Sequence, residues 1–233
     1  MKIQAPKHIN IYALDCLQAL KESGFGQYVV LCGAFGLFHY HEYRDTKDID
    51  AWWSEQATEE IKNKIVNEIK ETLLKHGEVK IRRFGDVVSV ELVKNSKIIF
   101  SFQIARRSAL IDRPRESPWP PVLLDSLKDL VASKMSALIE RGIPRDFIDV
   151  HELCDRNIVS IQQCWEWWDA REKNRGVSQI DFYQACEAIL LHLSRIERMR
   201  PLNSIENKQE QKQAENIRDW FKNTFCREMH DLD

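Results

Sequence analysis

The stretch at residues 28–53, YVVLCGAFGLFHYHEYRDTKDIDAWW, constrains the fold more than any other part of the chain. It opens on a short apolar run bounded by glycines, which is typical of a buried strand. Gly33 follows and begins a segment with the length and the apolar face of a short helix. Residues 49–53 then predict a second strand, and its period of two directs Asp48 and Asp50 to one face. The stretch therefore predicts a strand–turn–helix–strand unit with a pair of carboxylates near its end.

The composition predicts a chain that forms its own hydrophobic core and is soluble. Of the 233 residues, 43% are apolar and 30% are charged, and this length allows one large domain or two small ones. The formal net charge of −2 excludes a basic coat over the whole surface, although a local basic patch stays open. No apolar run approaches the roughly 20 residues that span a bilayer, and the chain start lacks the apolar centre of a secretory signal. We therefore expect a cytoplasmic protein with no membrane partner.

The six cysteines are scattered along the chain and include no C-x-x-C pair. This spacing disfavours both a thiol metal site and a disulfide framework, so reduced thiols in a cytoplasm are expected. The seven histidines show no zinc-ligand spacing.

Hydrophobic periodicity divides the chain into a mixed first part and a helical second part. Residues 87–93 and 98–104 form two apolar runs around the turn sequence Lys-Asn-Ser-Lys, which predicts a β-hairpin. Together with the two strands described above, they indicate a small sheet of about four strands. Helices are expected over residues 9–23, 33–43, 58–76, 127–141, 145–154, 161–173 and 178–199.

Four prolines within residues 113–121 interrupt regular structure and mark a boundary. We expect an α/β domain over residues 1–113 and a helical domain, without a convincing strand, over residues 122–233. In the last part, residues 203–227 are polar and gain helical character only near Ile217. The predicted fold class is therefore α+β: a mixed sheet with flanking helices, followed by a helical bundle.

Gly33 and the Asp48/Asp50 pair together suggest phosphate chemistry assisted by a metal ion. A strand–glycine–helix junction presents backbone N–H groups that accommodate phosphate. Two carboxylates on one face can hold a hard divalent cation, Mg²⁺ or Mn²⁺, through oxygen ligands, and such an ion bridges nucleotide phosphates in many enzymes. Each signal also has a purely structural interpretation: a tight turn for the glycine, and a solvated acidic turn before a strand for the carboxylates.

Motifs in two places resemble one known family. A glycine followed about one helix later by RDTKDID (residues 44–50) resembles the nucleotidyltransferase signature, and more narrowly the R-x-S-x-D-I-D sequence of the AbiEii/AbiGii-type nucleotidyltransferases. Further along, DLVASKMSALIER (residues 129–141) and RDFIDVHEL (residues 145–153) resemble that family's D-L-x-x-x-K-x-x-A-L-x-x-R and R-D-x-x-D-L motifs. The resemblance covers roughly residues 29–153.

The resemblance implies the nucleotidyltransferase fold of the polymerase-β-like superfamily and a toxin of a toxin–antitoxin or abortive-infection system. It implies that Asp48 and Asp50 hold the metal ion and take part in catalysis, with Lys134 and Asp149 completing the catalytic set from the helical domain. The residues implied to bind nucleotide are Gly33, Ala34, Arg44, Thr46, Lys134 and Asp146.

The cost of burying a charged group also favours a functional role for Lys134. This lysine lies among apolar residues of its predicted helix, and a partly buried ammonium group needs an anionic partner. A nucleotide phosphate would supply that partner, and so would Asp146 or Asp149, which share one helical face at i, i+3. The structural alternatives are a lysine that extends to solvent and ion pairs of the two aspartates with Arg141 or Arg145.

One position departs from the superfamily pattern. Enzymes of the superfamily usually place a third carboxylate on a later strand, and the corresponding position here holds Gln103. A glutamine carbonyl can ligate a metal ion but brings no charge, and Glu91 on the partner strand replaces it only if the geometry permits. Gln103 therefore supports an alternative interpretation, a catalytically weak or inactive member of the fold that binds nucleotide or a protein partner.

Basic residues flank the predicted hairpin and suggest a local patch for an RNA acceptor such as tRNA, which the resemblance implies for some family members. Charges on solvated strand ends are the structural alternative. The residues are Lys80, Arg82, Arg83, Arg106, Arg107, Arg113 and Arg115. The tryptophans at 165, 167 and 168 suggest base stacking, but their helical spacing favours the core of the bundle.

From these observations we predict a nucleotidyltransferase that uses Mg²⁺ or Mn²⁺ to transfer a nucleoside monophosphate from a nucleoside triphosphate to an acceptor, with release of pyrophosphate. The acceptor is RNA (tRNA among others) or a protein, and the resemblance implies a cognate antitoxin. A further alternative is a small-molecule adenylyltransferase of the aminoglycoside type, which an acidic rim around the cleft would favour.

Overall fold

A computed structural model describes residues 3–227 of the chain. The chain forms two compact units, Met1–Leu130 and Val131–Asp233, which we call the sheet unit and the helical unit. The first contains a sheet with helices on its faces, and the described part of the second contains only helices. The α+β fold class is therefore confirmed.

The division between the two units falls inside helix α4 (Leu127–Glu140) and not in the proline-rich segment at residues 113–121. Two short strands explain this position, β6 (Arg115–Glu116) and β7 (Leu123–Leu124). They pair with each other, and β7 pairs in parallel with β1 (Val29–Cys32). The proline-rich segment thus belongs to the sheet.

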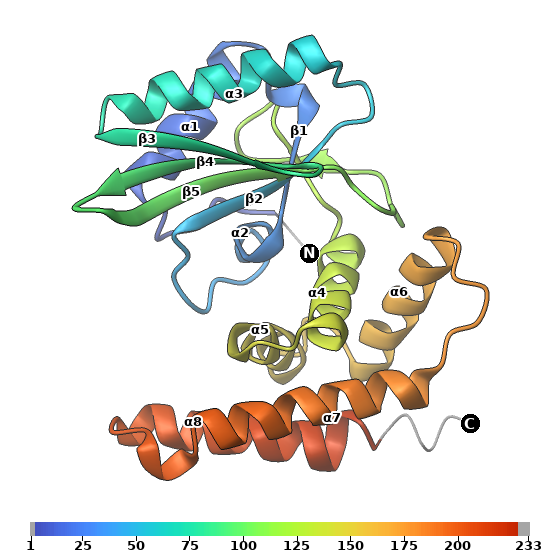
Figure 1. Cartoon of the computed structure of the whole chain (residues 1–233). Coiled ribbons are helices and arrows are strands. Elements are labelled where there is room, and N and C mark those ends of the chain that lie inside the picture. The colour runs from blue at the N-terminus through green and yellow to red at the C-terminus, as the bar shows by residue number, and fades with distance from the viewer. Residues whose placement is uncertain (1–2, 228–233) are drawn as a thin grey trace. The chain divides into compact units, whose positions relative to one another are not determined.

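The sheet is mixed and seven-stranded, with the order β3-β4-β5-β2-β1-β7-β6. Helices α1 (Ile11–Glu22) and α3 (Glu59–Leu74) pack against one face and share a single apolar core with it, while the short helix α2 (Gly33–Phe38) lies on the other face (Figure 1). The remaining strands are β2 (Asp48–Trp53), β3 (Glu78–Phe84), β4 (Val87–Lys94) and β5 (Lys97–Ala105).

Strand β2 has the predicted alternation. Ile49 and Ala51 are buried in the core beneath α1 and α3. Asp48 and Asp50 are half-buried on the opposite face, the one on which α2 lies. The period of two therefore places both carboxylates on the face opposite to α1 and α3.

The sheet has more strands than the expected four, and β3 is the largest addition. Its sequence, EVKIRRF, shows no clear apolar alternation, and most of its side chains are exposed because it is an edge strand. Strands β6 and β7 have two residues each, too few to give a periodic signal. The predicted β4–β5 hairpin is present, and Asn95 and Ser96 have φ of 51° and 60° at its turn, as a tight primed turn requires.

Helix α2 (Gly33–Phe38) is shorter than the predicted segment to Tyr43. The ring nitrogen Nδ1 of His39 hydrogen-bonds to the carbonyl oxygen of Phe35 at 2.9 Å. The backbone N–H groups of the next two residues both donate to Leu37 O, at 2.9 and 3.0 Å. These contacts satisfy the last carbonyls of the helix and end it early.

The helical unit contains the end of α4, then α5 (Pro144–Asp155), α6 (Ile161–Asn174), α7 (Phe182–Met199), α8 (Lys208–Trp220) and a π-helical turn (Phe221–Phe225). Trp165 and Trp168 are buried and stack edge-to-face with ring centroids 5.7 Å apart. Their predicted place in the core is therefore confirmed.

Helix α8 begins well before the expected onset of helical character near Ile217. The Asn207 side chain accepts hydrogen bonds from the N–H groups of Gln209 and Glu210, at 2.9 and 3.2 Å. This N-cap starts the helix within a polar sequence. Across the described part of the chain, no helix combines the length and the apolar character that crossing a membrane would require.

Candidate functional site

Strand pairing brings the carboxylate pair of β2 against the turn between β1 and α2. Cys32 pairs with Asp50 in antiparallel register, and Gly33 follows at once. Gly33 has a φ of +61°, and a Cβ built on it would lie 2.8 Å from Cβ of Asp50 and 2.9 Å from its Cγ. The left-handed backbone and the close approach both favour glycine. The glycine turn and the second aspartate are therefore in direct contact.

Asp48 is held by a short polar chain on the neighbouring strand. In the parallel β2–β5 pairing, Asp48 lies beside Ser101 and Asp50 lies beside Gln103. Ser101 Oγ donates to Asp48 Oδ1 at 2.7 Å, and Gln103 Nε2 donates to Ser101 Oγ at 3.2 Å. Gln103 thus occupies the place next to Asp50 where the superfamily pattern would put a third carboxylate.

Glu91 shares this sheet face but has other partners. It pairs in register with Ser101 from β4, two strand spacings or about 10 Å from β2. Its carboxylate lies 3.0 Å from Arg82 Nε and accepts a hydrogen bond from Ser89 Oγ at 3.3 Å. Within residues 3–227, no group of three or more His, Cys, Asp or Glu side chains is arranged to hold a metal ion. Glu91 does not replace the missing carboxylate.

The oxygen ligands that Asp48 and Asp50 offer suit Mg²⁺ or Mn²⁺, although they bring only two negative charges. Both carboxylates are half-exposed on one face, and the neutral amide of Gln103 stands beside them. These hard cations take oxygen ligands and readily keep several water molecules, so two protein carboxylates are a sufficient protein contribution. The residues therefore fit such an ion, with two formal negative charges rather than three.

The first motif contributes three further side chains whose predicted contact with nucleotide stays a prediction. Ala34 is buried in the first turn of α2. The Arg44 guanidinium lies 5.6 Å from the ring centroid of Phe38. Thr46 Oγ1 hydrogen-bonds to the carbonyl and the N–H of Asp48, at 3.2 and 3.3 Å, so it fixes the backbone where β2 begins.

In the helical unit, Lys134 has the anionic partner that its burial demands. Its Nζ lies 2.6 Å from Oδ2 of Asp149, and the two side chains are 9% and 0% exposed. The partner is therefore Asp149 from α5 and not solvent. That these two residues complete the site formed by Asp48 and Asp50 stays a prediction.

Asp146 is committed to a different contact. Its two carboxylate oxygens accept hydrogen bonds from Nε and NH2 of Arg141, both at 3.0 Å, and one of them also accepts the N–H of Ile143 at 3.3 Å. Asp146 is fully buried. The ion pair with Arg141, expected as a structural alternative, is present, and the contact of Asp146 with nucleotide stays a prediction.

Comparison with known families extends these motifs over most of the chain. The family model described as "Nucleotidyl transferase AbiEii toxin, Type IV TA system" matches residues 15–225. The chain belongs to the AbiEii family. The match reaches well past residue 153, so the AbiEii assignment also covers helices α6 to α8, which the two sequence motifs left unassigned. A search of curated proteins found no match to the chain.

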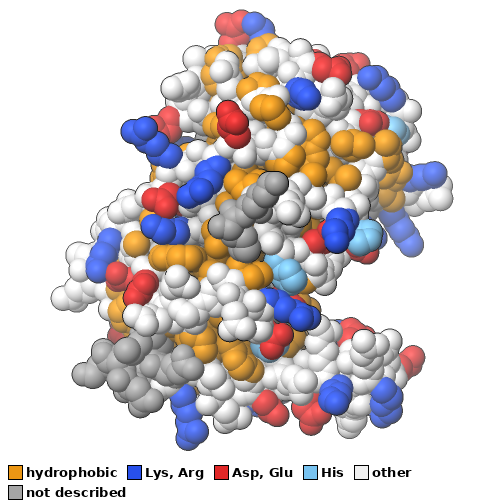
Figure 2. All heavy atoms as spheres, turned by 180° about the vertical axis from the view of Figure 1, so that it is seen from behind, with side chains coloured by type: hydrophobic (Ala, Val, Ile, Leu, Met, Phe, Trp, Pro, Cys, Tyr) orange, Lys and Arg blue, Asp and Glu red, His pale blue; other side chains and the backbone are white. Residues whose placement is uncertain are grey.

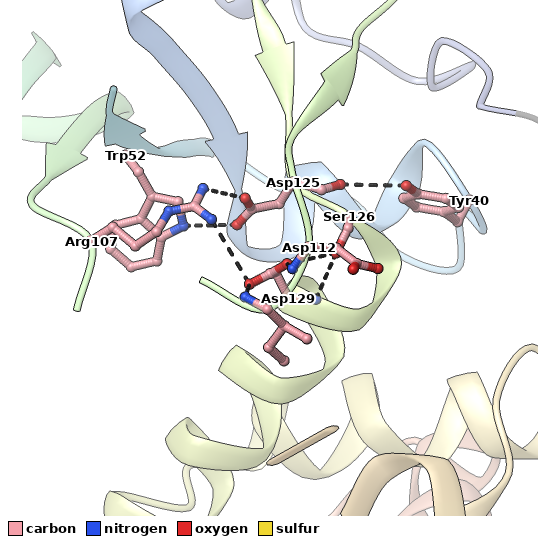
Figure 3. A network of polar contacts seen from close by, with 8 residues as sticks. Tyr40, Trp52, Arg107, Asp112, Asp125, Ser126 and Asp129 are labelled. Atoms are coloured by element: carbon pink, nitrogen blue, oxygen red, sulfur yellow. Dashed lines mark hydrogen bonds and ion pairs between the residues drawn. The ribbon is translucent and has the colours of Figure 1, made fainter. Parts of the chain in front are cut away.

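The sheet unit of this AbiEii protein also contains a buried polar network that the motifs did not predict. Trp52 and Arg107 converge on the carboxylate of Asp125 (Figure 3). Trp52 Nε1 donates to Asp125 Oδ2 at 2.9 Å, and the Arg107 guanidinium forms an ion pair with Oδ1. Burial raises the pKa of Asp125 to about 6, although the nearby Arg107 charge opposes this shift.

Asp129 forms the second half of this network at the start of α4. Its carboxylate accepts the N–H groups of Ile111 and Asp112, at 2.8 and 3.0 Å, and the hydroxyl of Ser126 at 2.6 Å. Ser126 Oγ in turn accepts the N–H of Asp129 at 3.1 Å. The S-x-x-D pattern at the helix start is a local signal for this arrangement. Asp125 has no comparable local signal, because its partners Trp52 and Arg107 are distant in the sequence.

Several residues of the predicted basic patch already have partners within the protein, so only part of the patch can contact RNA. Arg82 pairs with Glu91, Arg83 donates to Asn63 Oδ1 at 3.2 Å, and Arg107 is largely buried against Asp125. On the face that Figure 2 shows, Lys and Arg side chains are interspersed with Asp and Glu side chains. The surface in that view has no broad area of one sign.

Proposed function

We propose that this AbiEii-family protein transfers a nucleoside monophosphate from a nucleoside triphosphate to an acceptor and releases pyrophosphate, with Mg²⁺ or Mn²⁺ held by Asp48 and Asp50. The observation that carries the proposal is the contact between the Gly33 turn and Asp50, with Asp48 on the same face of β2. It joins a backbone suited to phosphate with carboxylates suited to a divalent cation.

The residues of the chain would divide the work as follows. The absence of a side chain at Gly33 makes room for the Asp50 carboxylate directly beside the turn. Ser101 orients Asp48 through its 2.7 Å hydrogen bond. When bound, the metal ion would neutralise charge on the triphosphate and polarise the attacked phosphorus. Arg44, Thr46, Lys134 and Asp149 are proposed to contact the nucleotide or the reacting group, in keeping with the family motifs.

The proposed acceptor is RNA, tRNA among others, or a protein. The family description supports a toxin, and we propose a cognate antitoxin as its biological partner. Gln103 beside Asp50 favours one second candidate, a member of the family with weak or no transferase activity that still binds nucleotide.

The test is incubation of the full chain with each labelled nucleoside triphosphate, Mg²⁺ and total RNA, beside the Asp48→Asn/Asp50→Asn variant. Asp86→Asn, which changes an exposed carboxylate in the β3–β4 turn, is the matched control. We expect label in RNA or protein with the wild type and the control, and none with the double variant. Retained nucleotide binding without any transfer would instead support the second candidate.

A further inference from the structure

A cavity lies in the sheet unit where β2 and β5 end, and neither aspartate of the pair lines it. It has a volume of about 380 Å³ and lies between the β2–α3 connection and the residues that follow β5. Its wall includes Trp53, whose side chain lies on the core face of β2, opposite to Asp48 and Asp50. The cavity is therefore separate from the proposed nucleotide site.

The wall of this cavity carries an excess of positive charge. It includes Lys62, Arg106 and Arg107 and a single acidic residue, Glu55. Arg106 is exposed, and among the described residues it makes no ion pair. An exposed guanidinium without an ion-pair partner in the wall of a cavity is suited to bind an anion by charge-assisted hydrogen bonds.

Lys62 is the second positively charged residue in the wall of this cavity. Its Nζ lies 6.0 Å from the ring centroid of Trp53. Its ion pair with Glu59, at 2.6 Å, is on the surface, where Glu59 is 82% exposed. Such pairs contribute little free energy and are screened by salt, so the ammonium group can exchange Glu59 for another anion.

Arg107 supplies a fixed positive charge behind these two side chains. Its NH2 group is held by Asp125. The NH1 group is buried without a hydrogen-bond partner and lies 3.9 Å from Oδ1 of Asp129. The guanidinium is thus held in one position, but Asp125 and Asp129 already share its charge, so Arg106 and Lys62 are the groups available to an anion.

We propose that this cavity binds the phosphate group of a small molecule, with Arg106 and Lys62 as direct contacts. Trp53 is only 8% exposed, so it offers too little ring surface for a nucleobase to stack on. The recognised element is therefore the phosphate group itself, either as free phosphate or as a phosphate monoester. Neither Asp48 nor Asp50 lines the cavity, so the inference does not depend on the proposed transferase activity.

Isothermal titration of the full chain with inorganic phosphate and with AMP, without divalent cations and at constant ionic strength, tests the inference. We expect saturable binding to the wild type and a loss of about tenfold in affinity for Arg106→Ala and for Lys62→Ala, the order of one charge-assisted contact. Tighter binding of AMP than of phosphate identifies a monoester as the ligand, whereas equal affinity identifies free phosphate.

Two controls separate this site from general charge effects and from the proposed active site. Lys64→Ala removes a lysine of the same helix that also pairs with a glutamate at 2.6 Å but does not line the cavity; we expect unchanged affinity. Asp48→Asn/Asp50→Asn should also bind phosphate as the wild type does. The inference is overturned if phosphate binding is not saturable, if Lys64→Ala weakens it as much as Lys62→Ala, or if the aspartate variant abolishes it.

Discussion

Gly33 and Asp50 touch across the β1–β2 pairing so closely that a Cβ at residue 33 would lie 2.8 Å from Cβ of the aspartate. We expect Gly33→Ala to lower the free energy of unfolding by about 2–4 kcal/mol, since it adds this clash to the cost of a left-handed backbone. Chemical denaturation checks the value. Gly85 also has a positive φ but no atom near its missing Cβ, so Gly85→Ala should cost only about 1 kcal/mol. Equal losses in both variants would contradict the importance of the contact.

Lys134 and Asp149 form a buried ion pair whose disruption should be costly. We expect Lys134→Met to lower the free energy of unfolding by about 3–5 kcal/mol, because Asp149 then keeps a buried charge without its ammonium partner. Lys173 and Asp169 form an exposed pair at 2.7 Å, so Lys173→Met should change stability by less than about 1 kcal/mol. Urea unfolding of both variants measures the two losses of stability. A small effect at Lys134 would show that Asp149 finds compensation elsewhere.

Gln103 stands beside Asp50 where a third carboxylate would complete the metal site. We expect Gln103→Glu to raise the affinity for Mn²⁺ by about tenfold, because a third negative charge is added next to two others. Titration of Mn²⁺ followed by electron paramagnetic resonance measures this. Ser101 now accepts from Gln103 and donates to Asp48, and with glutamate its hydroxyl can donate to only one of the two carboxylates. Unchanged Mn²⁺ affinity would place the ion away from Gln103.

His39 should make the sheet unit sensitive to acid. Burial lowers the pKa of His39 to about 4, against the opposing effect of its hydrogen bond to Phe35. The neutral ring therefore contributes stability that is present above pH 6.5 and is lost as the pH falls through about 4. The two pKa values correspond to about 3 kcal/mol. In urea unfolding at pH 7, 5.5 and 4.5, we expect His39→Gln to gain stability relative to the wild type as the pH falls, because it lacks this loss; a pH dependence equal to that of the wild type would refute the assignment.

Asp125 should change the free energy of unfolding with pH in the direction opposite to His39, over an overlapping pH range. Burial raises its pKa from 3.8 to about 6, so its contribution to stability is present below pH 3.8 and is lost as the pH rises through about 6, again by about 3 kcal/mol. The effects of His39 and Asp125 therefore offset each other in the wild type. In the Asp125→Asn variant, the free energy of unfolding should fall with the pH by the full amount that His39 contributes. Urea unfolding at the same three pH values measures this. A variant as insensitive to pH as the wild type would argue against this pairing.

Several features of the fold follow from short stretches of sequence. The alternation in β2, the turn at residues 94–97 and the glycine before α2 all depend on neighbouring residues, so local patterns predict them. The patterns missed the edge strand β3, because exposure removes the apolar alternation. They also extended α2 too far, because its end depends on the side-chain contact of His39 and on two backbone hydrogen bonds to Leu37 O, which leave no periodic signal.

The amino-acid order alone was sufficient to place Asp48 and Asp50 on one face of a strand after a glycine turn, and to indicate a family through two motifs. Only the tertiary structure decided which charges meet. Lys134 pairs with Asp149, and Asp146 pairs with Arg141. Asp125 contacts Trp52 of β2 and Arg107 of the segment that follows β5. The reason is physical: periodicity determines the direction of a side chain within its own element, whereas the partner of a buried charge depends on strand pairing and helix packing between distant residues. The Gly33–Asp50 contact needed both, a glycine at the turn and a register that brings the aspartate to it.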